Sequence, residues 1–144
     1  AVSDKNEFGY LNMSSTEVGG ALNEFNAKDL DSVGEGNYKE EVIFKQGMFS
    51  YSSDELIDKY GFEVPDYIKI DVDSIEDRII YGADKTLSNP KVKGVYIELD
   101  ETEERTQKMI DFLGEKGFSL IDKRQADIYA GSDYGTLYNY IFAK

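Results

Sequence analysis

The sequence predicts an α/β fold, and three observations support this class. Apolar runs of strand length alternate with helical apolar spacing over residues 67–122, in the order strand, helix, strand, helix, strand. The linkers between these runs are so short that consecutive right-handed crossovers and a partly parallel sheet are expected. The polar connection over 125–135 is too short for a helical crossover, so the last two strands should pair antiparallel as a hairpin.

The first half of the chain is expected to contain strands over 8–15 and 40–49, separated by a glycine-containing loop over 16–37. Ser52 and Glu55 form a capping box at the start of a short helix, which should end at Gly61. Pro65 then returns the chain to extended backbone.

Helices and strands alternate through the second half. Met109, Ile110 and Leu113 recur at helical spacing and are expected to face the core. A cap at Asp100 or Thr102 should begin that helix. The expected elements are strands over 67–72, 92–99, 118–122 and 137–142, and helices over 75–87 and about 103–117. With 144 residues the whole chain, 1–144, is expected to form one domain.

Composition excludes several kinds of chemistry. The chain has no cysteine and no histidine, so thiol nucleophiles, Ser-His-Asp triads and the usual zinc sites are excluded. Its formal net charge of -13 disfavours nucleic acid and anionic membrane surfaces. No apolar run is long enough for a membrane span, and no signal peptide is visible, which favours the cytoplasm. A small neutral or cationic ligand, or a protein partner, is more compatible.

Carboxylates gather where two predicted strands end. Asp71 and Asp73 lie at the end of the strand in "DYIKIDVDSIED", and Glu98 lies at the end of the next strand, "VKGVYIEL". The carboxyl ends of parallel strands meet at one edge of a sheet, and ligands bind beyond that edge. We therefore expect these three carboxylates to lie together at this edge and to form an acidic rim.

Structural explanations compete with a functional one for the acidic residues. Capping and interaction with the helix dipole are favoured for Glu76, Asp77, Asp100 and Glu103, whereas for Asp71 and Asp73 the two interpretations are evenly weighed. A calcium loop is rejected because an EF-hand requires glycine at its sixth position, where Glu76 stands. No metal site is predicted.

The stretch "PDYIKIDVDSIEDRIIYGADKTLSNPKVKGVYIELD", residues 65–100, resembles the core of the FkbM-type methyltransferases. Their hallmark is P-D-hydrophobic-I-K-I-D-V-E-G-x-E, a helix containing G-A, and a strand ending in I-E. The segments "AVSD", "SSDELIDKYG", "FLGEKGF" and "NYIFAK" extend the likeness over nearly the whole chain. The resemblance implies a Rossmann-like methyltransferase fold and S-adenosylmethionine as methyl donor. It also implies O-methylation of a hydroxyl on a sugar, glycan or natural product.

The resemblance also suggests roles for particular residues. Asp71 is the first candidate for proton acceptor or substrate orientation, and Asp73 is the second. Substrate contacts are expected from Lys69, Glu76 and Glu98. Ser3 and Asp4 are expected to touch the adenine side of the cofactor.

Two departures from the family pattern matter. Asp73-Ser74 replaces the usual E-G, and Ser74 is expected either to restrict the backbone or to cap the following helix. The family's glycine-rich cofactor loop would precede residue 1, so the chain is interpreted as the carboxyl-terminal part of a methyltransferase, inactive alone.

A non-catalytic binding or protein-interaction domain derived from the same fold is the alternative function. Loss of the first strands would expose a sheet edge and apolar surface, which predicts association with a second chain as a homo-oligomer.

Overall fold

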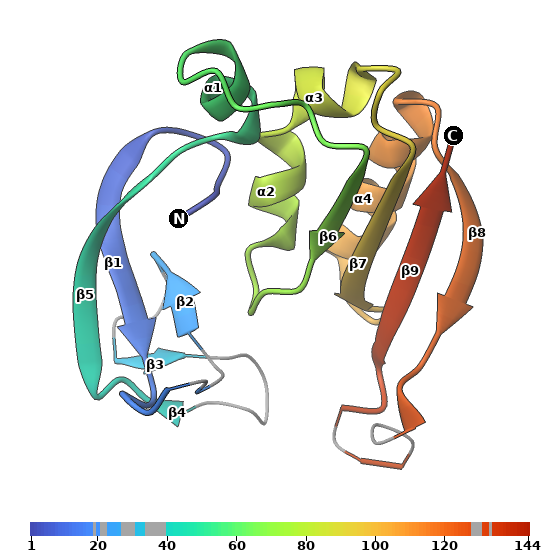
Figure 1. Ribbon diagram of the computed structural model, residues 1–144. Helices are drawn as coiled ribbons and strands as arrows, with labels where there is room; N and C mark the ends of the chain where they lie inside the picture. The colour runs from blue at the N-terminus through green and yellow to red at the C-terminus, as the bar shows by residue number, and fades with distance from the viewer. Residues whose placement is uncertain (19, 21–22, 27–30, 34–39, 128–130, 133) are drawn as a thin grey trace.

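The protein is a mixed α/β structure in which a four-stranded sheet and a three-stranded sheet lie on either side of a short helix (Figure 1). The computed structural model describes residues 1–18, 20, 23–26, 31–33, 40–127, 131–132 and 134–144. The α/β class predicted from the sequence is confirmed. The described part of the chain contains no helix that is both long enough and apolar enough to cross a membrane.

The larger sheet is mixed. It consists of β6 (Tyr67–Ile70), β7 (Gly94–Asp100), β9 (Leu137–Ala143) and β8 (Ser119–Arg124), in that spatial order. β6 and β7 are parallel, with Ile70 opposite Ile97, and β9 runs antiparallel to both of its neighbours. The antiparallel pairing of the last two strands is confirmed. β6 is two residues shorter than the predicted strand, because Val72 is exposed and lies outside the sheet.

β9 inserts between β7 and β8, so the strands joined by the second crossover are not neighbours. Burial explains this order, because Tyr140 and Phe142 of β9 are buried in the middle of the sheet. Leu120 and Ile121 of β8 are instead largely exposed, as suits an edge strand.

Three helices pack on the larger sheet and form the core with it. They are α2 (Glu76–Tyr81), α3 (Asp84–Ser88) and α4 (Glu104–Glu115). Met109 and Leu113 of α4 are buried and Ile110 packs against them, as their spacing predicts. The buried core cluster comprises Ile70, Ile80, Ala83, Leu87, Val92, Val95, Ile97, Leu99, Met109, Leu113, Phe118, Tyr140 and Phe142.

The prediction of one helix over 75–87 is wrong, because the helix breaks at Gly82. In a continuous helix the Gly82 carbonyl would accept from the Thr86 amide. Here Asp54 of α1 (Ser53–Asp58) takes both partners: its amide donates to the Gly82 carbonyl, and its carboxylate accepts from the Thr86 amide at 2.8 Å. The Ser3 carbonyl also approaches Gly82 so closely that a Cβ there would lie 2.1 Å from it. Packing of α1 and the amino-terminal segment therefore divides the helix.

The predicted helix caps are confirmed for α1 but not for α4 or α2. Ser52 caps α1 by accepting from the Glu55 amide at 3.2 Å, and Gly61 beyond the helix has φ +72°, as expected. The cap of α4 is Glu103 rather than Asp100 or Thr102, because Asp100 instead closes the preceding turn by accepting from the Thr102 amide and hydroxyl. Ser74 does not cap α2, whose first boundary residue is Ile75.

The amino-terminal half forms a separate three-stranded antiparallel sheet, the smaller sheet of the molecule. It contains β2 (Asn23–Phe25), β1 (Glu7–Met13) and β5 (Phe44–Ser50) in that order, and β3 (Ser32–Val33) pairs with β4 (Glu40–Glu41) nearby. The strand expected over 40–49 is thus divided into two. The loop expected over 16–37 contains two short strands, and part of it lies outside the described residues.

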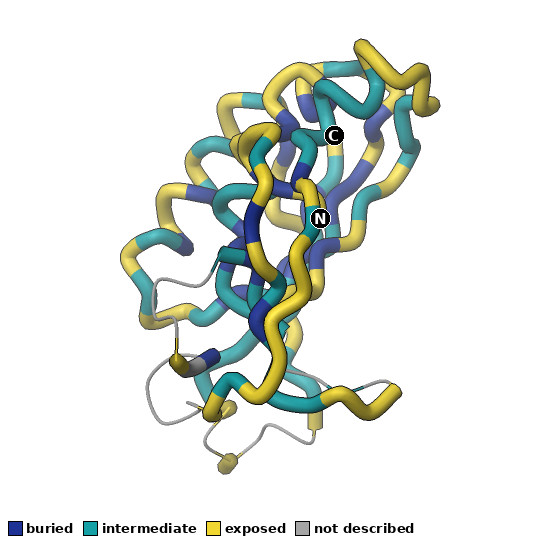
Figure 2. Tube along the Cα trace, turned by 90° about the vertical axis from the view of Figure 1, so that its left-hand side faces the viewer, coloured by how far each residue is buried: buried dark blue, intermediate teal, exposed yellow. Residues whose placement is uncertain are grey.

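Arg78 of α2 holds this sheet and the amino-terminal segment against the helix. Its guanidinium lies 2.9 Å from the Asp4 carboxylate and 2.6 Å from that of Glu7. These contacts place α2 between the two larger sheets (Figure 1). Figure 2 views the molecule from the side of the smaller sheet and shows long exposed stretches along it.

Candidate active site

Three acidic residues come together at the carboxyl ends of β6 and β7. Asp71 directly follows Ile70, which pairs with Ile97, so Asp71 lies beside Glu98 on the neighbouring strand. Burial raises the pKa of Glu98, and the nearby negative charges of Asp71 and Asp73 raise it further. The shared acidic rim expected from the sequence is therefore present.

Lys69 supplies the positive charge at this rim. Its ammonium lies 2.5 Å from the Asp71 carboxylate and 5.7 Å from the centroid of the Tyr96 ring. Both members of the ion pair are more than half exposed, at 62 % for Lys69 and 51 % for Asp71, so the pair is accessible to a ligand. Ion pairs as exposed as this one contribute little to the stability of the fold.

Asp73 connects the rim to the smaller sheet. Its carboxylate accepts a hydrogen bond of 3.1 Å from the backbone amide of Asn23 in β2. The next residue, Ser74, has φ +82°, which is the left-handed region favoured by glycine. Among the described residues, the buried Ser74 hydroxyl has no hydrogen-bond partner. The backbone conformation explains why glycine suits this position in the pattern that the sequence resembles.

Glu76 lies below the rim rather than on it. Only 6 % of its surface is exposed. Burial raises the pKa of Glu76 to about 7, although hydrogen bonds from the backbone amides of Glu76 and Ser74 and the nearby charge of Arg105 oppose the shift. The distance between the Glu76 carboxylate and the Arg105 guanidinium is 3.5 Å. The structure thus turns this carboxylate inward, toward Arg105.

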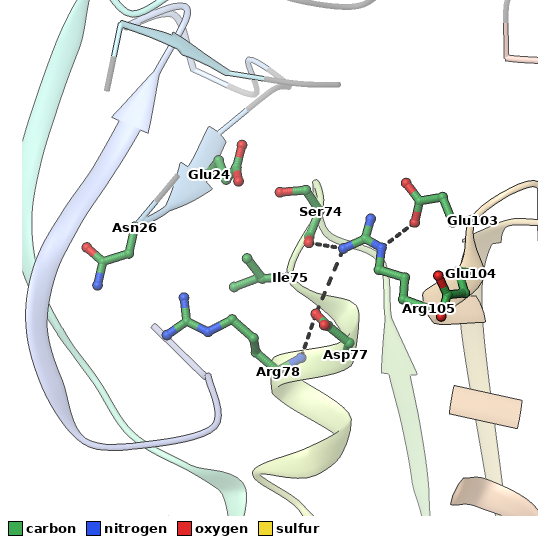
Figure 3. A pocket seen from close by; sticks show the side chains of 9 residues that line it. All are labelled: Glu24, Asn26, Ser74, Ile75, Asp77, Arg78, Glu103, Glu104 and Arg105. Carbon is green, nitrogen blue, oxygen red and sulfur yellow. Dashed lines mark hydrogen bonds and ion pairs between the residues drawn. The ribbon is translucent and has the colours of Figure 1, made fainter. Parts of the chain in front are cut away.

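A pocket of about 340 Å³ opens between β2 and the first turns of α2 and α4 (Figure 3). This volume lies in the range of about 300–1,000 Å³ that is typical of small-molecule sites. The pocket adjoins the rim, because Ser74 follows Asp73 and lies in the pocket wall. Its lining residues are Glu24, Asn26, Ser74, Ile75, Asp77, Arg78, Glu103, Glu104 and Arg105.

Sequence reasoning missed Arg78 and Arg105, the two arginines of this pocket. Arg105 is the second residue of α4 and lies in its first turn, where the helix dipole disfavours a positive charge, whereas Arg78 lies in the last turn of the short helix α2. The unfavourable placement of Arg105, in a chain with 29 acidic residues, is the signal that could have singled it out.

Ser3 and Asp4 lie away from the rim, next to Arg78. Ser3 is fully buried, and its hydroxyl donates to the Asp4 carboxylate at 2.9 Å. Burial opposes ionisation of Asp4, but hydrogen bonds from Arg78 and Ser3 lower its pKa overall. The Ser3 hydroxyl and one oxygen of the Asp4 carboxylate are thus engaged within the protein. Cofactor contact by these residues stays a prediction.

The described residues contain no group of three or more acidic side chains arranged to hold a metal ion. The chemistry that this arrangement supports directly is acceptance of a proton or hydrogen bond by exposed carboxylates at the end of a partly parallel sheet.

The fold is that of an α/β protein in which two parallel strands end beside a group of carboxylates. Residues 2–120 match the model of the family described as Methyltransferase FkbM domain, and the chain belongs to this family. The match ends within β8. No curated protein and no solved structure matched the chain.

Proposed function

We propose that the protein serves S-adenosylmethionine-dependent transfer of a methyl group to a hydroxyl of a sugar, glycan or natural product. Membership of the methyltransferase family supports the reaction class. The observation that supports the location of the site is the convergence of Asp71, Asp73 and Glu98 where β6 and β7 end. We further propose that the larger sheet belongs to a Rossmann-like methyltransferase fold.

Asp71 is the residue that we propose accepts the proton of the acceptor hydroxyl or orients that hydroxyl. Its carboxylate is exposed at the rim and is held by Lys69. Methyl transfer from a sulfonium, which the donor supplies when bound, is an in-line displacement that requires approach geometry and at most one proton acceptor. An exposed carboxylate satisfies that requirement without cysteine or histidine.

Glu98 and Asp73 have supporting roles in this proposal. Because burial and its acidic neighbours raise its pKa, Glu98 takes up a proton more readily than an exposed glutamate does. A protonated Glu98 could donate a hydrogen bond to an acceptor oxygen. Asp73, which is fixed by the Asn23 amide, is the second candidate for contact with the hydroxyl.

A non-catalytic binding module is the second candidate function. It is favoured by the serine at position 74, which adopts a backbone conformation suited to glycine and departs from the family pattern. Methyl transfer distinguishes the two candidates, because a binding module would hold a ligand at the rim without transferring a methyl group to it.

The test is an assay of the product of the complete coding sequence with isotopically labelled S-adenosylmethionine, extracted glycans and small metabolites. Transfer of label to a hydroxyl-bearing acceptor is the expected result, and absence of transfer to every fraction would favour the binding module.

A further inference from the structure

Arg105 makes more charged contacts than the other residues of the pocket wall. Its guanidinium donates to the Ser74 carbonyl and to the Glu103 carboxylate. It also lies 3.5 Å from the carboxylate of Glu76 and 3.8 Å from that of Asp77. Figure 3 shows the guanidinium between the turn at Ser74 and the start of α4. One side chain of α4 therefore reaches both the turn that follows β6 and the first turn of α2.

The turn that Arg105 contacts has an unfavourable backbone conformation. Ser74 has φ +82°, where a side chain with a Cβ is disfavoured. Such a conformation persists when surrounding contacts determine it. The Ser74 hydroxyl is buried and makes no hydrogen bond among the described residues, so it does not stabilise its own turn.

Backbone contacts fix the turn instead. Asp73, one residue before Ser74, is held by the Asn23 amide. Arg105 binds the Ser74 carbonyl, and its positive charge lies close to the Glu76 carboxylate. A planar guanidinium can donate to a carbonyl and to carboxylates at the same time, which an ammonium on a single flexible stem does less well.

We propose that Arg105 is a positioning residue, which holds the left-handed turn at Ser74 and thereby keeps Asp73 at the acidic rim. Its consequence for catalysis rests on the proposed function, whereas its consequence for the turn does not. The competing explanation is an ordinary ion pair between α4 and α2, which would stabilise the protein without acting on Ser74 in particular.

The test combines Arg105→Gln with Ser74→Gly and measures amide hydrogen exchange over residues 71–77. If Arg105 holds the turn, Arg105→Gln should speed exchange there about tenfold, because the turn opens locally. Glycine adopts the left-handed conformation without strain, so Ser74→Gly in the Arg105→Gln background should restore most of the protection. Arg105→Lys keeps the positive charge but not the planar guanidinium. Its residues 71–77 should be less protected from exchange than those of the Arg105→Gln, Ser74→Gly double variant.

Arg124 provides a matched control. It lies on the edge strand β8, where its side chain is 75 % exposed and pairs with Asp122 on the same strand. Arg124→Gln should leave exchange over 71–77 unchanged. Unchanged exchange in Arg105→Gln, or a loss of protection that Ser74→Gly does not restore, would overturn the proposal. Should Arg105→Gln fail to fold, Arg105→Lys with and without Ser74→Gly gives the same comparison.

Turnover separates this inference from the proposed function. In the product of the complete coding sequence, Arg105→Gln should lower kcat with little change in KM, and Ser74→Gly should recover it. If exchange behaves as expected but no methyl transfer is found, the positioning role stands and the proposed function fails. If methyl transfer is found but exchange is insensitive to Arg105, the positioning role fails alone.

Discussion

Glu76 shows how a single buried carboxylate can respond to pH near neutrality. Its side chain is excluded from water at the start of α2, and the Arg105 charge only partly offsets the cost of burial. The folded protein therefore binds a proton at Glu76 up to about pH 7, whereas the unfolded chain releases it near the ordinary value of 4.5.

A pH-dependent stability follows with a defined sign. Between the two pKa values the folded state binds more protons than the unfolded state, so the contribution of Glu76 to stability falls as pH rises from about 4.5 to 7. The free energy of unfolding of Glu76→Gln minus that of wild type should therefore increase by about 2 kcal/mol from pH 5 to pH 8. Urea unfolding at both pH values measures this difference. A gap between the two proteins that is constant with pH would contradict the account.

Single residues also show what the sequence could predict about the site. Asp71 and Glu98 were placed on one rim because parallel strands align their carboxyl ends, a rule that needs no side-chain detail. The inward orientation of Glu76 and its pairing with Arg105 depend on how α4 packs against α2, across 29 residues of chain that the local pattern does not connect.

At the scale of elements, the break between α2 and α3 depends on partners from elsewhere in the chain. The apolar spacing of residues 75–87 is that of one helix, and nothing in this segment indicates that Asp54 will bind the Gly82 carbonyl and the Thr86 amide. The position of β9 between β7 and β8 has a similar origin. Its antiparallel direction followed from a short connection, but its neighbours were decided by burial of Tyr140 and Phe142.

Two glycines in helical segments should respond in opposite ways to alanine. Gly82 lies against the Ser3 carbonyl, where a Cβ would come within 2.1 Å, so Gly82→Ala should lower the free energy of unfolding by about 1–3 kcal/mol. A Cβ at Gly114 in α4 would meet nothing within 4 Å, so Gly114→Ala should raise it by about 0.5 kcal/mol through helix propensity. Chemical denaturation compares both variants with wild type. Equal effects would mean that the amino-terminal segment does not pack on Gly82.

At the scale of the whole molecule, the smaller sheet presents aromatic side chains to solvent. Phe8 packs edge-to-face on Phe49 at 5.4 Å and on Tyr10 at 5.6 Å between ring centroids, and each of the three is at least half exposed. This surface is compatible with the predicted association with a second chain, which stays a prediction. The net charge of -13 opposes contact between copies.

Association of copies should therefore depend on salt. Raising the ionic strength from about 0.01 M to about 1 M shortens the screening length from about 30 Å to 3 Å, so the mass from light scattering should rise. Phe49→Ser should reduce this rise, whereas Ile121→Ser, an equally exposed apolar residue on β8, should not. A mass equal to that of one chain, measured at high protein concentration and at both ionic strengths, would rule out self-association through this surface.

The most direct test of the acidic rim compares two aspartates at opposite ends of β6. Asp71 and Asp66 are similarly exposed, at 51 % and 43 %, and each pairs with a lysine, but only Asp71 lies at the carboxyl end of the strand. In the product of the complete coding sequence, Asp71→Asn should lower the rate of methyl transfer about 100-fold or more, while Asp66→Asn should leave it near wild type. Equal rates in the two variants would contradict the assignment of this rim as the reaction site.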